Sequence, residues 1–113
     1  MNTVTIEVAS REETNARFLS AMDGEPQGNF ITFPSHEALW ATLTANRWAI
    51  LKALTGAGPL GVRELARRLG RDVKGVHTDT QALVLGGVID KTADGKLLFP
   101  YDAVRVELLL QAA

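Results

Sequence analysis

The chain has 113 residues, of which 46% are hydrophobic, and its formal net charge is −1. These values predict one compact globular domain, with or without an appended arm, and no overall attraction to nucleic acid. Cysteine is absent, which excludes disulfides and thiolate metal sites and favours a reducing, cytoplasmic compartment. No apolar run approaches the roughly 20 residues of a membrane helix. The first residues lack the basic-then-apolar order of a signal peptide, so we expect no membrane association.

Residues 1–34 predict a strand–helix–strand arm. Apolar and polar residues alternate over 3–9, which is typical of a half-buried strand. Ser10 and Glu13 have the spacing of a capping box, which marks the start of a helix. That helix is expected to bury Phe18, Leu19 and Met22. A short strand over 29–33, closed by Pro34, completes the arm.

Residues 35–59 predict two helices. Ser35 is a suitable N-cap for the first, and Thr44 for the second, which ends in the Gly- and Pro-rich segment 56–59. The apolar positions of these helices include Trp40 and Trp48. We expect both tryptophans to pack in the core, with a ligand pocket between the arm and the rest of the chain as the alternative.

The segment 61–89 predicts a helix-turn-helix. The first helix has apolar residues at helical spacing up to Gly70, and only residues 70–72 separate it from the second helix. The second helix is expected to bury four side chains, which are Val73, Val76, Thr80 and Leu83. The Gly-Gly pair at 86–87 is expected to end it.

The remaining residues predict strands. Residues 88–99 form a β-hairpin pattern around Asp94-Gly95, a dipeptide suited to a tight turn. Alternation over 104–110 predicts a last strand, which pairs either within the chain or with a second copy because unpaired edges invite association. We expect a homodimer whose interface includes the following apolar residues: Val4, Ile6, Val8, Phe18, Leu19, Val106 and Leu108.

The charges are distributed unevenly along the chain. Residues 1–39 carry a balance of −4 and residues 40–113 a balance of +3. A basic cluster lies within the predicted helix-turn-helix and comprises Arg63, Arg67, Arg68, Arg71 and Lys74. Such a cluster is typical of a phosphate-binding surface, and the alternative is a solvated helix face, which can carry the same number of basic residues.

The outward side of the second helix carries hydrogen-bonding and cationic side chains, which are Lys74, His77, Thr78 and Gln81. Such groups recognise base edges in the major groove of DNA, and the alternative is an ordinary solvated face. Gly75 would allow close approach to the duplex, or it is a tolerated helix defect. The candidate phosphate contacts are Arg47, Arg71, Arg63, Arg67, Lys91 and Lys96. Arg47 could instead form a structural link with Asp72 or Glu37, and the two lysines could serve solubility.

We predict neither a metal site nor an enzyme, and no cofactor. His36 and His77 are the only histidines, and no acidic residues lie at ligand spacing beside both. Residues 35–37 contain hydrolase residue types, but helix capping explains them. The glycines at 56, 58 and 61 lack the GK[ST] ending of a phosphate-binding loop.

The order of three helices and a hairpin resembles the MarR-like winged helix-turn-helix regulators over residues 44–100. The similar segments are LTANRWAILKAL (43–54), GPLGVRELARRLGRD (58–72), VHTDTQALVLGGVI (76–89) and DKTADGKLLF (90–99). Nearly the whole chain, including ITFPSHEALWATLTANR (31–47), is similar to a family of small prokaryotic DNA-binding proteins with such an arm. The chain departs from the pattern at Gly61, where a capping Ser or Thr is usual, and at Thr80, where Leu is usual. We expect the Thr80 hydroxyl to bond a carbonyl of the preceding turn.

The resulting prediction is an α+β fold with a winged helix-turn-helix. Residues 1–34 form the arm, and residues 35–113 form the winged domain with the last strand. The expected function is that of a homodimeric, sequence-specific regulator of transcription that binds double-stranded DNA and represses its own promoter. By analogy with the resembled family, it would also be the antitoxin of a toxin pair. The alternative is a protein-interaction module that neutralises a partner protein without specific DNA binding.

Overall fold

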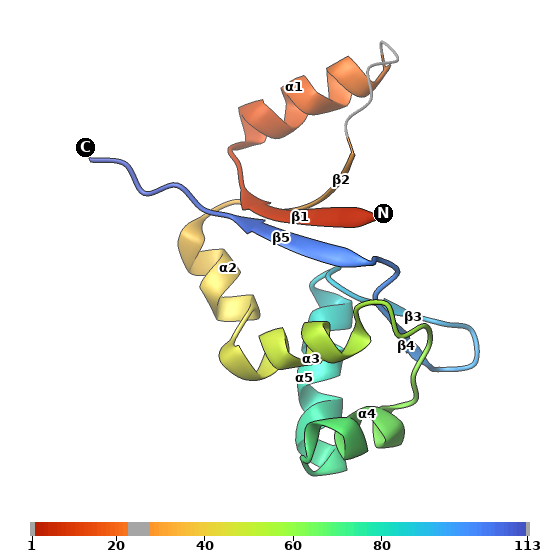
Figure 1. Ribbon diagram of the computed structural model, residues 1–113. Helices are drawn as coiled ribbons and strands as arrows, with labels where there is room; N and C mark the ends of the chain where they lie inside the picture. Colours follow the sequence, from red (N-terminus) through yellow and green to blue (C-terminus); the bar gives the residue numbers. More distant parts are fainter. Residues whose placement is uncertain (1, 23–27, 113) are drawn as a thin grey trace.

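The computed structural model describes residues 2–22 and 28–112 and has the α+β order of elements that the sequence predicts (Figure 1). The five strands are β1 (Thr3–Val8), β2 (Asn29–Phe33), β3 (Asp90–Lys91), β4 (Leu97–Leu98) and β5 (Ala103–Glu107). The five helices are α1 (Arg11–Met22), α2 (His36–Thr42), α3 (Ala45–Leu54), α4 (Val62–Leu69) and α5 (Val73–Leu85).

Polar side chains cap the predicted helix starts. The Ser10 hydroxyl accepts a hydrogen bond from the Glu13 N–H at 3.1 Å, and the Glu13 carboxylate accepts one from the Ser10 N–H, so the capping box is confirmed. Ser35 and Thr44 cap α2 and α3 in the same way, at 3.1 and 3.3 Å. These bonds satisfy N–H groups that have no partner within a helix.

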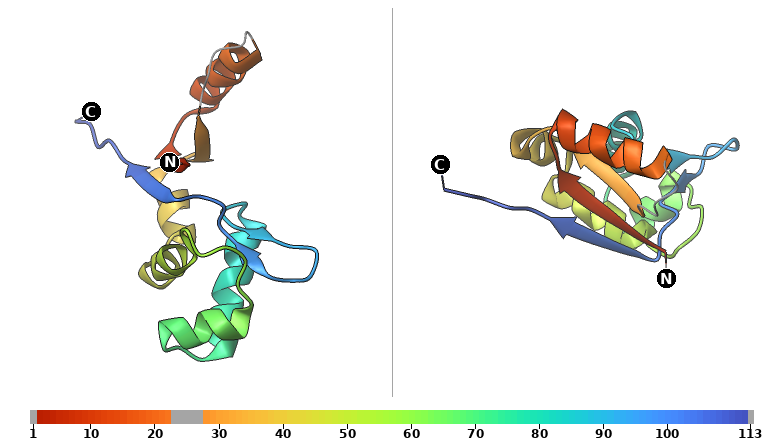
Figure 2. Two further views of the ribbon diagram at one scale, coloured as in Figure 1. Left: turned by 45° about the vertical axis from the view of Figure 1, so that its right-hand side comes forward. Right: turned by 90° about the horizontal axis from the view of Figure 1, so that it is seen from above.

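The first and last strands lie side by side in one three-stranded sheet with the order β2-β1-β5. Both pairs are parallel, and Ile6 of β1 faces Ile31 of β2 and Val106 of β5. Parallel strands need a long crossover, which α1 provides between β1 and β2. Helix α1 covers one side of the sheet, whereas the helices from α2 to α5 lie on the other side (Figures 1 and 2). The last strand therefore pairs within the chain.

Two residues expected in the dimer interface are instead buried inside the molecule. Val4 and Ile6 have no exposed area, because β1 is the central strand and their side chains point into the core. They are unavailable to a second copy. Val8 is partly buried and packs against the same core. Leu19, which was also expected to be buried by its helix, is 60% exposed. The side chains of Phe18 and Met22 lie outside the described residues.

A single hydrophobic core joins the sheet to the helices. It includes Val4 and Ile6 from β1, Leu39 from α2, Ile50 from α3 and Phe99 beyond the hairpin. The predicted boundary after residue 34 therefore does not separate two cores. The last strand, which we assigned to the second unit, instead extends the sheet of the first.

The two tryptophans are less buried than the sequence predicts. Trp48 is half-buried and packs against the core, as predicted in part. Trp40 is 56% exposed, so its predicted burial is wrong. Leu39, its neighbour in α2, occupies the core position instead. A helix this short presents only one face to the core, and Trp40 lies outside that face.

Candidate nucleic-acid interface

A tight turn joins α4 to α5. Gly70 ends α4 with φ +66°, a left-handed conformation that glycine adopts without strain. The Arg71 N–H then donates to the Ala66 carbonyl at 3.0 Å. Asp72 caps α5, because its carboxylate accepts a hydrogen bond from the Gly75 N–H at 2.8 Å. The turn predicted at residues 70–72 is thus confirmed.

The inward side of α5 anchors the helix in the core. Val76 and Leu83 have no exposed area, and Thr80 is only 2% exposed. The Thr80 hydroxyl donates to the His77 carbonyl at 3.0 Å, as expected from its unusual position. A buried hydroxyl is tolerated here because its hydrogen bond is made within the helix.

The outward side of α5 carries the four predicted polar residues together. Lys74, His77 and Thr78 are exposed, and Gln81 is half-buried. The Gln81 amide nitrogen lies 3.3 Å from His77 Nε2, and the Thr78 hydroxyl donates to the Lys74 carbonyl at 3.1 Å. Leu85 also lies on this side of the helix, seven residues after Thr78, and is 86% exposed, although its residue type gave no sign of this in the sequence.

A partly buried ion-pair network fixes α5 against its neighbours. Asp79 accepts a hydrogen bond from Arg47 of α3 at 3.2 Å and another from Arg71 of the turn at 2.9 Å. Arg47 also donates to the Thr42 carbonyl at 3.0 Å, at the end of α2. These three charged side chains are between 16% and 25% exposed. One carboxylate therefore ties α5 to α3 and to the turn between α4 and α5.

This network corrects the predicted roles of two arginines. Arg47 is a structural link, but its partner is Asp79 rather than Asp72 or Glu37. Arg71 binds the same carboxylate through Nη2, so it too links α5 to its neighbours. Arg71 Nη1 is buried without a hydrogen-bond partner among the described residues.

Gly75 has a structural reason that the sequence did not reveal. A Cβ at this position would lie 3.1 and 3.2 Å from the carboxylate oxygens of Asp72 and 3.3 Å from Arg71 Nη2. A side chain here would require the carboxylate that caps α5 to shift by a few tenths of an ångström. The space that the Asp72 cap occupies is therefore one reason for glycine at position 75, and it does not depend on close approach to a duplex.

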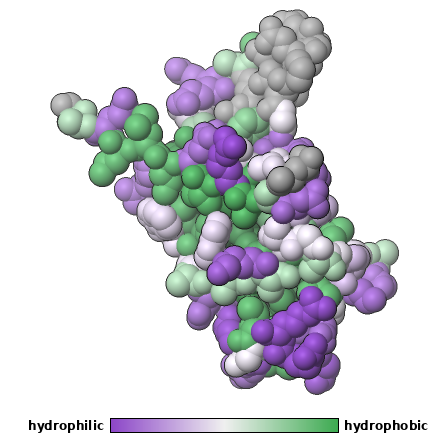
Figure 3. Space-filling model, viewed as in Figure 1, coloured by the Kyte–Doolittle hydropathy of each residue, from purple (hydrophilic) through white to green (hydrophobic). Residues whose placement is uncertain are grey.

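The surface of α4 carries three arginines and one glutamate. Arg63, Arg67 and Arg68 are exposed. Glu64 pairs with Arg67 and Arg68, and the hydrogen bond from Arg67 lowers the pKa of Glu64 to about 2. Hydrophilic side chains gather over this end of the molecule in Figure 3. Arg63 has no ion-pair partner within residues 2–22 and 28–112.

The hairpin formed by β3 and β4 projects beside the helices (Figure 1). Gly95 has φ +83°, as expected for the predicted Asp-Gly turn. Lys91 and Lys96 are exposed, and Lys96 lies 4.0 Å from Asp94. A hydrogen bond from the Thr92 hydroxyl lowers the pKa of Asp94, which keeps this turn anionic at its tip. The two lysines flank that tip.

No group of three or more His, Cys, Asp or Glu side chains that could hold a metal ion occurs in the described parts of the chain. None of the helices within those same ranges is long and apolar enough to cross a membrane.

These features define a small α+β domain in which an uncovered polar helix face lies beside a basic helix and a lysine-bearing hairpin. The chain matches the HVO_A0114 family over residues 42–106, more than half of its length, and belongs to this family. The match runs from the end of α2 to β5 and so contains every candidate nucleic-acid contact. A search of curated proteins found no match to this chain.

Proposed function

We propose that this protein is a sequence-specific DNA-binding regulator with a winged helix-turn-helix, in which α5 enters the major groove. The observation that carries the proposal is the outward side of α5. Lys74, His77 and Thr78 are exposed on a helix that is anchored on its opposite side by Val76 and Leu83. A rigid helix with polar side chains on one uncovered side is the arrangement that base recognition requires.

Each part of the surface has a distinct role in this proposal. Lys74 bonds guanine or a phosphate, and Gln81 bonds adenine through its amide after its contact with His77 is released. The exposed arginines of α4 neutralise phosphates, which position the protein without reading sequence. The lysines of the hairpin, Lys91 and Lys96, contact the adjacent minor groove or its phosphates. Arg47 and Arg71 act indirectly, because they hold α5 in place through Asp79.

The test is binding to a fluorescent random-sequence duplex of about 30 base pairs between 50 and 200 mM NaCl. If about four phosphates are neutralised, the logarithm of the association constant should fall with the logarithm of salt at a slope of about −4. Selection from a random pool should then enrich one sequence. Absence of binding at 50 mM salt, or an affinity that salt does not change, would refute the proposal.

Glu64→Gln should strengthen this binding. Glu64 pairs with Arg67 and Arg68 and offsets one of their two positive charges, and because its pKa is about 2 it remains ionised at every pH at which DNA binding is measured. Removing its charge adds one net positive charge to α4, so affinity should rise several-fold and the salt slope should steepen by about 1.

The control for this variant is Glu37→Gln, on the exposed surface of α2, which should leave affinity unchanged. An unchanged or weaker affinity of the Glu64 variant would show that α4 does not face the duplex.

A protein-interaction role is the second candidate, and the two glutamates in the first turn of α1 support it. Glu12 and Glu13 are exposed in the first turn of that helix, in a segment whose charge balance is −4 up to residue 39. Such a surface suits a basic partner, and an antitoxin would use it while α5 represses the promoter. Co-purification with the product of the neighbouring gene tests this role. Loss of that partner in the variant Glu12→Lys, which leaves the Ser10–Glu13 capping box intact, is the expected result.

A further inference from the structure

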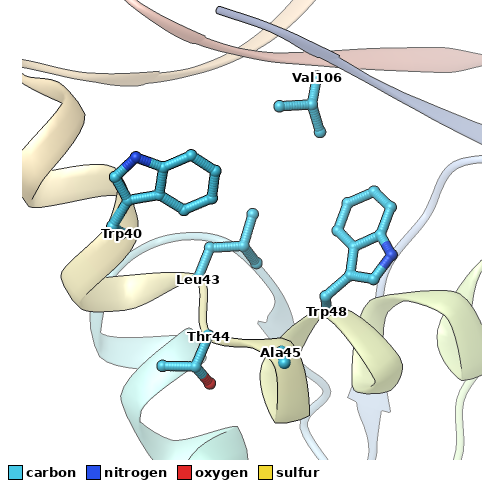
Figure 4. Close-up of a pocket in the computed structure, with 6 residues that line it drawn as sticks. All are labelled: Trp40, Leu43, Thr44, Ala45, Trp48 and Val106. Atoms are coloured by element: carbon cyan, nitrogen blue, oxygen red, sulfur yellow. The ribbon is translucent and has the colours of Figure 1, made fainter.

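An apolar pocket of about 490 Å³ opens beside β5. The residues that line it come from α2, α3 and β5, and they are Trp40, Leu43, Thr44, Ala45, Trp48 and Val106. Figure 4 shows both indole rings pointing up toward β5, while Val106 points down between them from the strand. These are the only two tryptophans in the chain. An exposed apolar surface of this kind is typical of an interaction site.

The strand above the pocket ends in an exposed apolar tail. Val106 and Leu108 are 36% and 40% exposed, and Leu109 and Leu110 are 69% and 94% exposed. The tail extends away from the rest of the molecule in every view (Figures 1 and 2). Hydrophobic side chains form one patch over β5 and this tail in Figure 3.

The outer edge of β5 pairs with no strand of the described chain. β5 lies at the end of the sheet order β2-β1-β5, so only its β1 side is hydrogen-bonded. An exposed edge of five residues is a template for another strand. The apolar pocket, the apolar tail and the unpaired edge of β5 therefore lie next to one another.

The side chains of β5 are complementary to themselves in one register. Val104 packs against the core and Val106 lines the pocket, so the even-numbered residues face the helices. Arg105 and Glu107 are exposed and lie 3.5 Å apart. If two copies of β5 pair in antiparallel orientation with Arg105 opposite Glu107, Val106 must lie opposite Val106 and Leu108 opposite Val104.

We propose that a second copy of this chain covers the pocket by antiparallel pairing of the two β5 strands about a two-fold axis at Val106. In this dimer Val106 and Leu108 of the second copy lie over the Trp40–Trp48 pocket, and two Arg105–Glu107 pairs form on the opposite side of the sheet. A two-fold axis makes the interface isologous, so both pockets are covered at once. This dimer rests on the proposed function and extends it, because a two-fold dimer would place one α5 on each half of a symmetric DNA site.

Single cysteines test the register, since the chain has no cysteine of its own. Val106→Cys should form a disulfide-linked dimer on mild oxidation, because facing residues in an antiparallel pair have Cα atoms about 4.5 to 5.5 Å apart. Arg105→Cys is the matched control. In the proposed dimer the two copies of residue 105 lie one residue on either side of the two-fold axis. Their Cα atoms are then about 8 Å apart, which is too far for a disulfide. Linking at 105 equal to that at 106 would overturn the register.

The charge pairs give a second test. Arg105→Glu and Glu107→Arg should each raise the dimer dissociation constant, by about 10-fold, because each creates two like-charge pairs across the axis. The double variant restores opposite charges and should restore the dimer. A double variant that is no better than the single ones would overturn the proposal.

Tryptophan fluorescence reports whether the pocket is covered, because both indoles line it. The emission should shift to shorter wavelength with rising protein concentration, in parallel with the dimer fraction from light scattering. The inference would be overturned if the protein remained monomeric at tens of micromolar. It would also be overturned if the tryptophan emission shifted only when a small apolar dye was added. DNA binding is measured separately, so a monomer that still binds DNA refutes this dimer and leaves the proposed function intact.

Discussion

Replacing Asp79 with asparagine is expected to lower the free energy of unfolding by about 2 kcal/mol. Arg47 and Arg71 both depend on this carboxylate, at 3.2 and 2.9 Å, and both are mostly buried. Removing one partner of a fully buried pair leaves an uncompensated charge and costs about 3–5 kcal/mol. The residual exposure of 16–25% reduces that penalty here. Thermal denaturation should show a fall in Tm of roughly 10 °C.

The matched control is Asp90→Asn. Asp90 is exposed on β3 and forms no side-chain hydrogen bond or ion pair with any residue that the structure describes. This variant should keep its Tm within about 2 °C. If the two variants were equally stable, the ion pairs of Asp79 would not hold α5 against α3 and the α4–α5 turn.

Replacing Lys74 and Gln81 together with alanine is expected to abolish sequence preference while leaving the fold intact. Each good bidentate contact to a base is worth about 1–3 kcal/mol of discrimination. The ratio of affinities for the selected and random duplexes should therefore fall by about 100-fold. Neither side chain is fully buried or joined to an ion pair, so the Tm should change little.

Lys52→Ala controls for the loss of a positive charge. Lys52 is an exposed lysine on α3 rather than on α5. It should leave the affinity ratio unchanged within about twofold. A double variant at 74 and 81 that still discriminates between the duplexes would show that another surface reads the sequence.

Local signals predicted the helices of this chain well, because each depends on neighbouring residues. The Ser10–Glu13 capping box, the Ser35 and Thr44 caps and the positive φ of Gly70 and Gly95 all occur where the residue types predict them. The amphipathic pattern of α5 also predicted the burial of Val76, Thr80 and Leu83, whereas Val73 is only partly buried.

Contacts between distant segments were not predictable in the same way. Asp79 lies 32 residues from Arg47, and nothing in either neighbourhood indicates the pair. The alternation of β1 and β5 showed that both are strands, but it did not distinguish pairing within one chain from pairing between copies. Trp40 has the residue type of a core position, yet its exposure depends on how α2 meets the sheet.

The central claim is that the outer face of α5 lies in the major groove, and disulfide trapping tests it most directly. Thr78→Cys supplies the only thiol of the chain, and the selected duplex carries a thiol tether on cytosine N4, a major-groove position. We expect a cross-link in high yield from residue 78 and none from Lys52→Cys. A duplex that binds but fails to cross-link to residue 78, or that links equally to residue 52, would contradict the proposal.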